Sequence, residues 1–232
     1  MAGETAKCEA ICLRIIPWSR TSHIVTWLTP AGRLSTVVKG AVRPKSAFLG
    51  QYDLNYTCEI VYYLRAKGEL HALRECTPLE GREGLRANYR ALLLAEHCRR
   101  LAFDLAPTGP EAAAWFDLLG ATLTRLTDPE VRLLPELLAY ELAVLHLAGL
   151  DPELEAEAGA FVLRGERRIP VAPATARCLK SPYVVKYSDT LLDAVRVIGV
   201  FYAFHLDCAP ETRRTILQII STTEQRTGNQ NV

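Results

Sequence analysis

The chain has 232 residues, of which 49% are hydrophobic, and a mean hydropathy of +0.06, which excludes global disorder and predicts a packed core. Its seven cysteines are scattered without a C-x-x-C pair, a pattern typical of reduced thiols in a cytoplasm. The first twelve residues lack the apolar run of a signal peptide, and the most apolar segments farther along carry charges. We therefore expect a soluble cytoplasmic protein with buried helices instead of membrane spans.

The net charge is only +1, but the charges are unevenly distributed along the chain. Residues 1–80 hold ten Lys and Arg against seven Asp and Glu, whereas residues 81–232 hold seventeen against nineteen. Between residues 10 and 52 there is no acidic residue and there are six basic ones, namely Arg14, Arg20, Arg33, Lys39, Arg43 and Lys45. A one-sign field of this kind attracts a polyanion, so a nucleic acid is the first ligand class to consider.

The first eighty residues alternate in the manner of strands and predict an all-β region. A tight turn is expected at 30–33 and a longer loop over 42–55, where prolines and glycines interrupt the pattern. Five short strands with a long connection after the third favour an OB-fold barrel, and a small antiparallel sandwich is the alternative. The predicted strands are Cys8–Ile16, Ser22–Leu28, Arg33–Ala41, Thr57–Arg65 and Leu70–Thr77.

Beyond residue 80 the apolar residues recur at helical spacing. Helices are predicted from Leu85 to about Leu105 and over 111–126. A third helix is predicted from an Asp128 N-cap to about Ala148, with Gly149 as its C-cap. Pro135 lies about one turn inside this helix, so an irregular or kinked start is expected. Residues 151–173 predict a small hairpin, and helices are expected over 174–179, 188–206 and 209–220, before a polar tail. The predicted fold class is α+β, with an OB-fold domain over residues 1–80 and a helical domain over 81–232.

The segment from Val38 to Phe48 concentrates cations, a hydroxyl and an aromatic ring in a loop braced by Pro44. Lys39, Arg43 and Lys45 suit contacts to phosphates, and Phe48 or Tyr52 suits stacking on an unpaired base. The alternative is a solvated basic loop in which Phe48 folds under as part of the core.

Several segments resemble the RecO family of bacterial DNA repair and recombination mediators. The similarity is carried by residues 39–48, by Ser22–Thr29 and Gly32–Ser35 before them, by Ala10–Arg14, by Leu73–Glu75, and more weakly by Tyr140–Leu150 in the helical part. The resemblance implies an OB-fold that binds single- and double-stranded DNA, an attached helical domain and no covalent catalysis. It also implies recombinational repair of the RecF pathway in a nucleoid-associated bacterial protein. Such a protein anneals strands coated with single-strand binding protein and, with RecR, helps to load RecA.

The resemblance carries over residue by residue at the basic loop. Lys39, Arg43, Lys45 and Ser46 match the family's DNA-binding loop, whereas Val42 and Ala47 stand where many members carry a further basic residue. Electrostatics adds Arg14, Arg20 and Arg33 to the predicted DNA-binding residues, and Phe48 is added as a stacking candidate.

Many members of the family also carry four zinc-binding cysteines after the position of Leu150. Residues 151–176 of this chain contain neither Cys nor His, and zinc needs such ligands at close spacing, so the family's zinc site is predicted to be absent. Cys178 alone does not replace it, and no cofactor is expected.

No combination of residues indicates an active site. His97 and Cys98 are adjacent on a predicted helix and point about 100° apart, so they do not pair as base and nucleophile. Arg125 and Arg132 lie around the turn between two predicted helices, where a groove is expected for the acidic tail of single-strand binding protein, the partner that the family implies. A simple corner between helices is the alternative.

Two other classes of function compete with a recombination mediator. A basic OB-fold also suits an RNA-binding module of translation or RNA maturation, which would not accelerate the annealing of DNA coated with single-strand binding protein. A metal-dependent nuclease would need carboxylates near the basic residues, and the absence of Asp and Glu from 10 to 52 argues against it.

Overall fold

The computed structural model describes residues 4–65, 70–155, 160–163, 167–184, 189–206 and 212–219. The chain forms two compact units, one of Met1–Ala87 with Cys98–Thr127 and the other of Asn88–His97 with Asp128–Val232. Strands give way to helices after Glu80, as the sequence predicts, but the contacts group Cys98–Thr127 with the strands. The domain boundary near residue 80 therefore remains a prediction.

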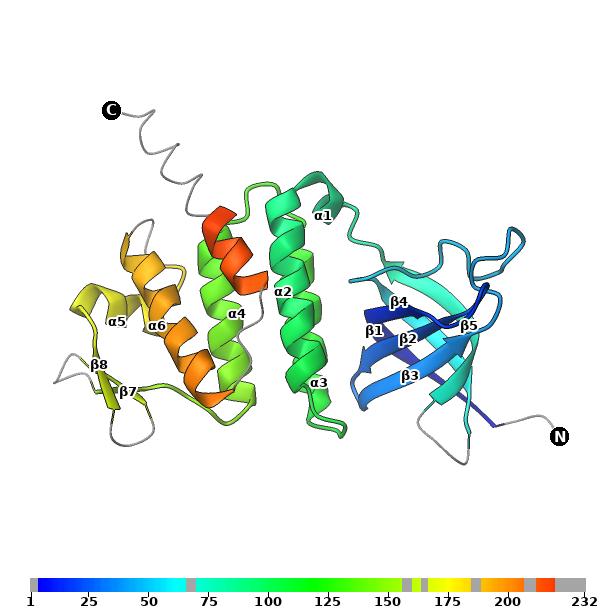
Figure 1. The fold of residues 1–232 in the computed structure, drawn as a ribbon, viewed down its shortest axis with the longest axis horizontal. Helices are drawn as coiled ribbons and strands as arrows, with labels where there is room; N and C mark the ends of the chain where they lie inside the picture. Colours follow the sequence, from blue (N-terminus) through cyan, green and yellow to red (C-terminus); the bar gives the residue numbers. More distant parts are fainter. Residues whose placement is uncertain are drawn as a thin grey trace. The chain divides into compact units, whose positions relative to one another are not determined.

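Five strands of the first unit close into a barrel (Figure 1). They are β1 (Thr5–Pro17), β2 (His23–Thr29), β3 (Gly32–Val38), β4 (Thr57–Tyr63) and β5 (Leu70–Glu80). The strand order is β1-β2-β3-β5-β4, and β4 returns to β1. All pairings are antiparallel except β3 with β5, which is the arrangement of an OB-fold, so the predicted barrel followed by helices is confirmed.

The long strand β1 makes closure possible because it pairs twice. Its first half, up to Ile11, pairs with β4 and its second half pairs with β2, with an irregularity between Cys12 and Arg14 where the register shifts. Such bulges bend a strand and allow it to serve two sheets. The barrel core gathers around Trp27, which is fully buried and whose indole Nε1 donates to Thr36 Oγ1 at 2.8 Å.

The turn between β2 and β3 depends on one glycine. Only Pro30 and Ala31 separate the two strands, and Gly32 has a φ of 123°. A Cβ at Gly32 would lie 2.8 Å from the carbonyl carbon of Thr108, so the turn requires glycine both for its backbone conformation and for this close approach.

The predicted helix from Leu85 onward is interrupted in the structure. A short helix, α1 (Gly84–Ala87), precedes α2 (Tyr89–Leu105), and the side chain of Asn88 between them accepts hydrogen bonds from the backbone N–H groups of Arg90 and Ala91. Asn88 therefore acts as the N-cap of α2, and a new helix begins after it. The next helix, α3 (Ala112–Arg125), lies close to the predicted range and contacts β2 and β3.

The helix α4 (Leu133–Leu147) begins later than predicted. The Asp128 carboxylate accepts from the backbone N–H of Glu130 in a separate turn, and Arg132 is the N-cap. Pro135 therefore stands in the first turn, where a missing N–H costs no helical hydrogen bond. The C-cap is Ala148, one residue before the predicted Gly149. Gly149 follows with a φ of 68° and donates its N–H to the His146 carbonyl, while Leu150 N–H donates to the Leu145 carbonyl.

The rest of the second unit consists of a small sheet and further helices. Strands β6 (Glu153–Glu155), β7 (Ala160–Leu163) and β8 (Arg167–Pro170) form an antiparallel sheet in this order, which extends the predicted hairpin by one strand. Helices α5 (Pro173–Lys180) and α6 (Asp189–His205) follow, and residues 212–219 are also helical. The predicted polar tail lies outside the described residues. Among those described, no helix is long and apolar enough to cross a membrane.

Candidate nucleic-acid interface

Two loops of the barrel are hydrogen-bonded to each other at the open end of the β2–β3 hairpin, where β2 begins and β3 ends. The first loop follows β1 and contains Arg20; the second follows β3 and begins at Lys39. The backbone N–H of Val42 donates to the Thr21 carbonyl at 3.3 Å, and the N–H of Gly40 donates to Ser22 Oγ at 3.4 Å. The structure thus ties together two basic segments that are separate in the sequence. We call Arg20, Lys39, Arg43 and Lys45 the basic loop cluster.

The basic loop cluster is exposed, and its positive charge is not neutralised. All four side chains are exposed, and within the described part of the chain none of them takes part in an ion pair. The neighbouring Trp18 is 65% exposed on the same loop as Arg20. Exposed cations beside an exposed aromatic ring are the combination that single-stranded nucleic acids use, through phosphate contacts and base stacking.

The buried side of the loop after β3 contacts the barrel core. Ser46 Oγ accepts from the backbone N–H of Phe48, and the half-buried Phe48 side chain packs against the barrel core. The Gln51 carbonyl accepts from the thiols of Cys58 and Cys76 at 3.5 and 3.6 Å. The buried side of the loop therefore anchors it, and stacking of Phe48 on a base remains a prediction.

Tyr52, the other stacking candidate, also faces the barrel. Its hydroxyl lies 2.8 Å from His23 Nδ1, and its ring meets the Trp27 ring edge to face at 5.9 Å between centroids. Burial raises the pKa of Tyr52, with the nearby Cys12 and Cys76 as smaller contributors. These contacts make Tyr52 part of the loop's anchor.

Arg14 and Arg33 form a second basic group with Phe103 of α2. Their guanidinium carbons lie 5.5 and 5.7 Å from the centre of the Phe103 ring, and Arg33 Nη1 donates to the Phe103 carbonyl. Arg14 pairs with Thr26 in the β1–β2 ladder, and Arg33 pairs with Leu28 in the β2–β3 ladder. The six basic residues of the acid-free stretch are thus divided between two places on the barrel unit.

Arg125 and Arg132 belong to different units and are described separately. Arg125 ends α3 in the first unit and donates to Thr122 Oγ1 at 3.0 Å. Arg132 caps α4 in the second unit and donates to the Tyr183 carbonyl at 3.4 Å. A peptide groove at these two arginines remains a prediction.

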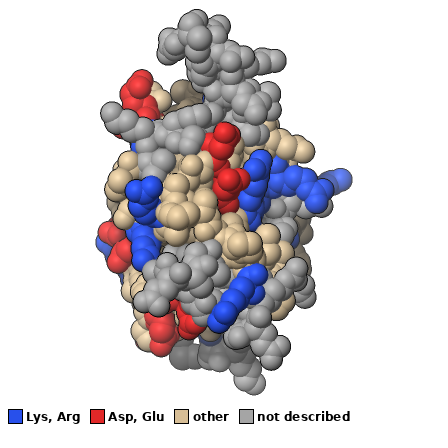
Figure 2. Space-filling model, turned by 90° about the vertical axis from the view of Figure 1, so that its left-hand side faces the viewer, with Lys and Arg blue, Asp and Glu red and all other residues tan. Residues whose placement is uncertain are grey.

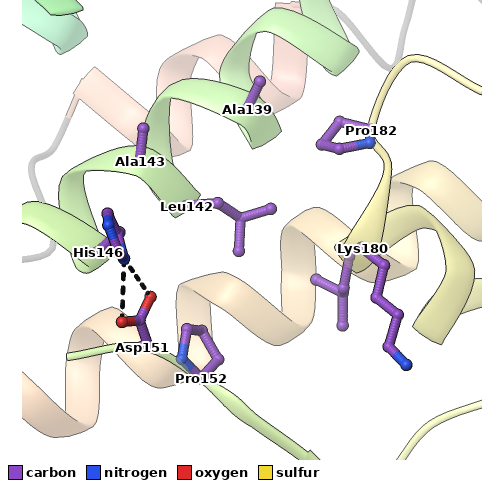
Figure 3. Close-up of a pocket in the computed structure, with 9 residues that line it drawn as sticks. Ala139, Leu142, Ala143, His146, Asp151, Pro152, Lys180 and Pro182 are labelled. Carbon is purple, nitrogen blue, oxygen red and sulfur yellow. Dashed lines mark hydrogen bonds and ion pairs between the residues drawn. The ribbon is translucent and has the colours of Figure 1, made fainter.

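The second unit contains a cavity of about 620 Å³ (Figure 3). The α4 side chains Ala139, Leu142 and Ala143 line one side, and Lys180 of α5 stands opposite them. At one end His146 Nδ1 meets the Asp151 carboxylate at 2.9 Å. The cavity is therefore apolar along α4, with a cation at one edge and, at another, a carboxylate within hydrogen-bond distance of His146.

Figure 2 shows the face of the molecule that carries α5 and α6. Lys and Arg side chains alternate there with Asp and Glu among uncharged residues. On α6, the exposed Arg196 pairs with Asp193 at 2.9 Å. This pair differs from the basic loop cluster, whose four cations form no ion pair with the described residues.

The residues of the second unit do not fit a zinc ion at the position of the family's metal. Residues 151–176 supply no thiol or imidazole, and within the described residues no group of three or more His, Cys, Asp or Glu could hold a metal. Nearby Cys178 is buried, and burial raises its pKa. The predicted absence of a zinc site remains a prediction.

An ion network inside the second unit does not follow from the sequence patterns. Arg213 holds the fully buried Glu141 with both ends of its guanidinium, Nε to Oε1 at 2.7 Å and Nη2 to Oε2 at 3.1 Å. His97 Nε2 lies 3.0 Å from the same Oε1. Burial acts to raise the pKa of Glu141, but Arg213 and His97 together lower it below its usual value. An acidic residue within an apolar helical stretch was the available signal.

Comparison with known proteins identifies the family. A family model described as "Recombination protein O N terminal" matches residues 1–82, and one described as "Recombination protein O C terminal" matches residues 86–226. This chain belongs to the RecO family. The first match ends just after β5 and the second begins within α1, so the RecO resemblance seen in the basic loop extends through the helices.

Individual relatives agree with the RecO assignment, and each of the following is named DNA repair protein RecO. The chain is 29% identical over 150 residues to a protein of Alkaliphilus metalliredigens, covering 64% of this chain and 60% of the relative. It is 28% identical over 180 residues to one of a Roseiflexus species, covering 77% and 62%. It is 33% identical over 150 residues to one of Rhodopirellula baltica, covering 62% and 53%. The chain thus spans about three fifths of the length of the first two relatives.

Proposed function

We propose that this protein is a DNA repair and recombination mediator that binds single- and double-stranded DNA and anneals complementary strands. The observation that carries the proposal is the basic loop cluster, with four exposed cations on two joined loops and no ion pair to any of them among the described residues. Phosphate contacts from such cations give affinity that is independent of sequence. Membership of the RecO family and the printed name of the relatives support DNA as the polyanion.

The proposed role requires strands to be held and released intact. Lys39, Arg43 and Lys45 contact phosphates from one side, and the exposed Trp18 offers a ring for an unpaired base. Contacts to the backbone leave the base edges of both strands available for pairing, which is what annealing needs. The proposal includes RecR as the partner with which the protein helps to load RecA onto DNA coated with single-strand binding protein, at the bacterial nucleoid.

Salt-dependent binding of a fluorescent single strand tests the proposed surface. The variant Lys39→Ala/Arg43→Ala/Lys45→Ala should bind more weakly, and its slope against log salt should be shallower by about 2, because each phosphate contact on a single strand contributes about 0.7. A matched control is Arg177→Ala/Arg196→Ala/Arg214→Ala, which removes the same charge from exposed positions of the second unit. Equal slopes for the wild type and the loop variant would refute this surface.

Annealing separates the DNA mediator from an RNA-binding module. The wild type should accelerate pairing of complementary DNA strands coated with single-strand binding protein, and the loop variant should do so less. An RNA-binding module would leave this rate unchanged. A labelled strand incubated with the protein and magnesium should keep its full length, and shortened products would instead support a nuclease.

The partner expected for the helical part is the acidic, apolar tail of single-strand binding protein. Two places in the second unit suit it in chemical terms, the surface around Arg132 and the cavity along α4 with Lys180 at its edge (Figure 3). Peptide titrations of Arg132→Glu and Lys180→Glu distinguish these places. The variant that loses affinity marks the place, and unchanged binding by both would exclude them.

A further inference from the structure

A cavity on the barrel unit lies beside the second basic group. Its volume is about 420 Å³, within the range of small-ligand sites. The side chains that line it are mostly able to form hydrogen bonds, and they include Thr26, Arg33, Ser35, His71, Phe103 and Thr108. All of them belong to the first compact unit, so the cavity is a property of that unit alone.

Arg33 lines this cavity, and Arg14 lies against the same Phe103 ring as Arg33. Neither Arg14 nor Arg33 forms an ion pair with any described residue, although both lie against the ring of Phe103. The Nε of Arg33 is buried and has no hydrogen-bond partner in the described structure. Two guanidinium groups against one ring, without an ion pair among the described residues, are suited to a phosphate group.

The remaining groups in the cavity suit the nucleoside attached to such a phosphate. The hydroxyls of Thr26 and Ser35 lie 3.3 Å apart on paired positions of β2 and β3, and each can donate or accept. His71 Nδ1 accepts from the backbone N–H of Arg65, and its ring lines the cavity. Hydroxyls and an imidazole beside apolar surface form a mixed lining that would accept a base or a sugar.

The cavity lies within reach of a strand bound at the basic loop cluster. Ser35 lies three residues before Val38, the last residue of β3, so its Cα is roughly 10 Å from the start of the loop at 3.3 Å per residue. That separation corresponds to about three stacked nucleotides at 3.4 Å each. One strand can therefore reach both places.

We propose that this cavity takes a single nucleotide out of the bound strand, with its phosphate at Arg14 and Arg33 and its nucleoside between Phe103 and the hydroxyls of Thr26 and Ser35. In this arrangement Phe103 is a positioning residue, because its ring and carbonyl hold the two guanidinium groups. The inference rests on the proposed function, since it requires that the protein binds DNA. It adds that one base of the bound strand is unstacked.

Fluorescence of 2-aminopurine tests whether a base leaves the stack. We would use adenine strands in which every fourth base is 2-aminopurine, whose emission is quenched by stacking and rises on extrusion. The wild type at saturation should raise the emission. Ser35→Trp should still bind the strand at saturation but without this rise, because the indole fills the cavity.

Two further variants change the cavity less than Ser35→Trp does, so that the test does not depend on whether Ser35→Trp folds. Thr26→Val/Ser35→Ala removes the hydroxyls with little change of volume and should reduce the rise. Arg14→Gln/Arg33→Gln should make the salt slope shallower by about 0.7, one phosphate contact. Its matched control is Lys7→Gln/Arg74→Gln, which removes the same charge from two side chains that are ion-paired with Glu59 and Glu75.

The outcomes separate this inference from the proposed function. If the wild type binds the strand with a steep salt slope but never changes the emission, or if Ser35→Trp keeps the rise, the cavity does not take a base and the DNA-binding role stands. If the wild type binds no strand at low salt, both proposals fail. A rise that survives in the Lys39→Ala/Arg43→Ala/Lys45→Ala variant at saturation, and is lost in Ser35→Trp, supports the cavity as a separate contact.

Discussion

The basic loop cluster and the interior of the second unit differ in where their charged residues lie and in whether these residues are paired. The basic loop cluster keeps four cations exposed, without an ion pair among the described residues, and the helical unit buries Glu141 and pairs it with Arg213 and His97. An exposed cation costs little to keep in water and is available to a ligand. A buried carboxylate must be paired because desolvation is costly. The cations of the basic loop cluster are therefore available to a ligand, whereas the buried carboxylate of Glu141 is occupied by partners inside the fold.

The largest expected effect comes from breaking the buried pair. Arg213→Met should lower the free energy of unfolding by about 3–5 kcal/mol, because it leaves Glu141 buried with one partner fewer. Urea denaturation followed by circular dichroism measures this loss. Arg196→Ala is the control, since it breaks an exposed pair and should change stability by about 0.5 kcal/mol or less. A similar small loss for Arg213→Met would contradict the contrast drawn between the two regions.

A smaller effect on the free energy of unfolding is expected when the pH is lowered. The pKa of Glu141 is lowered in the folded protein, so its ionised form contributes stability above the unfolded pKa, about 4.3, and that contribution disappears as the pH falls through the folded value. The stability difference between the wild type and Glu141→Gln should therefore be full at pH 7 and narrow as the pH falls below about 4. Urea titrations at several pH values measure it, and a difference that stays constant down to the acid limit would count against a paired carboxylate.

The smallest effect on stability is expected at the loop. Lys39→Ala/Arg43→Ala/Lys45→Ala should change the free energy of unfolding by about 0.5 kcal/mol or less, because exposed substitutions away from packing contacts rarely do more. The same variant should lose affinity for DNA. Thermal unfolding beside the binding titration checks both. A marked loss of stability would show that these cations stabilise the barrel, and it would contradict the contrast between the loop and the buried pair.

The sequence predicts local features of this molecule better than distant pairings. The five strands follow from alternation, and the basic loop follows from a run of residues without acids. The parallel pairing of β3 with β5, the approach of Phe103 to Arg14 and Arg33, and the bond from Arg213 to Glu141 join positions far apart in the chain. Periodicity carries no information about which element meets which.

Two helix starts show how local chemistry overrides periodicity. Asn88 has the side chain to cap a helix, yet the apolar spacing runs across it, so a single helix was predicted where there are two. The Asp128–Pro129 pair carries the signature of a helix start, but the helix begins at Leu133 and the aspartate closes a turn instead. At the candidate site, the contact between the loops of Arg20 and Lys39 was likewise out of reach, since it rests on backbone hydrogen bonds.

The anchoring of the loop after β3 has a calorimetric consequence. Its backbone is tied to Thr21 and Ser22, and its far end is held by the thiols of Cys58 and Cys76. A surface formed before the ligand arrives does not fold on binding, and folding coupled to binding is what produces a large negative heat-capacity change. Titration calorimetry at several temperatures should therefore give nearly the same binding enthalpy, with the favourable entropy of released counterions as the main driving force.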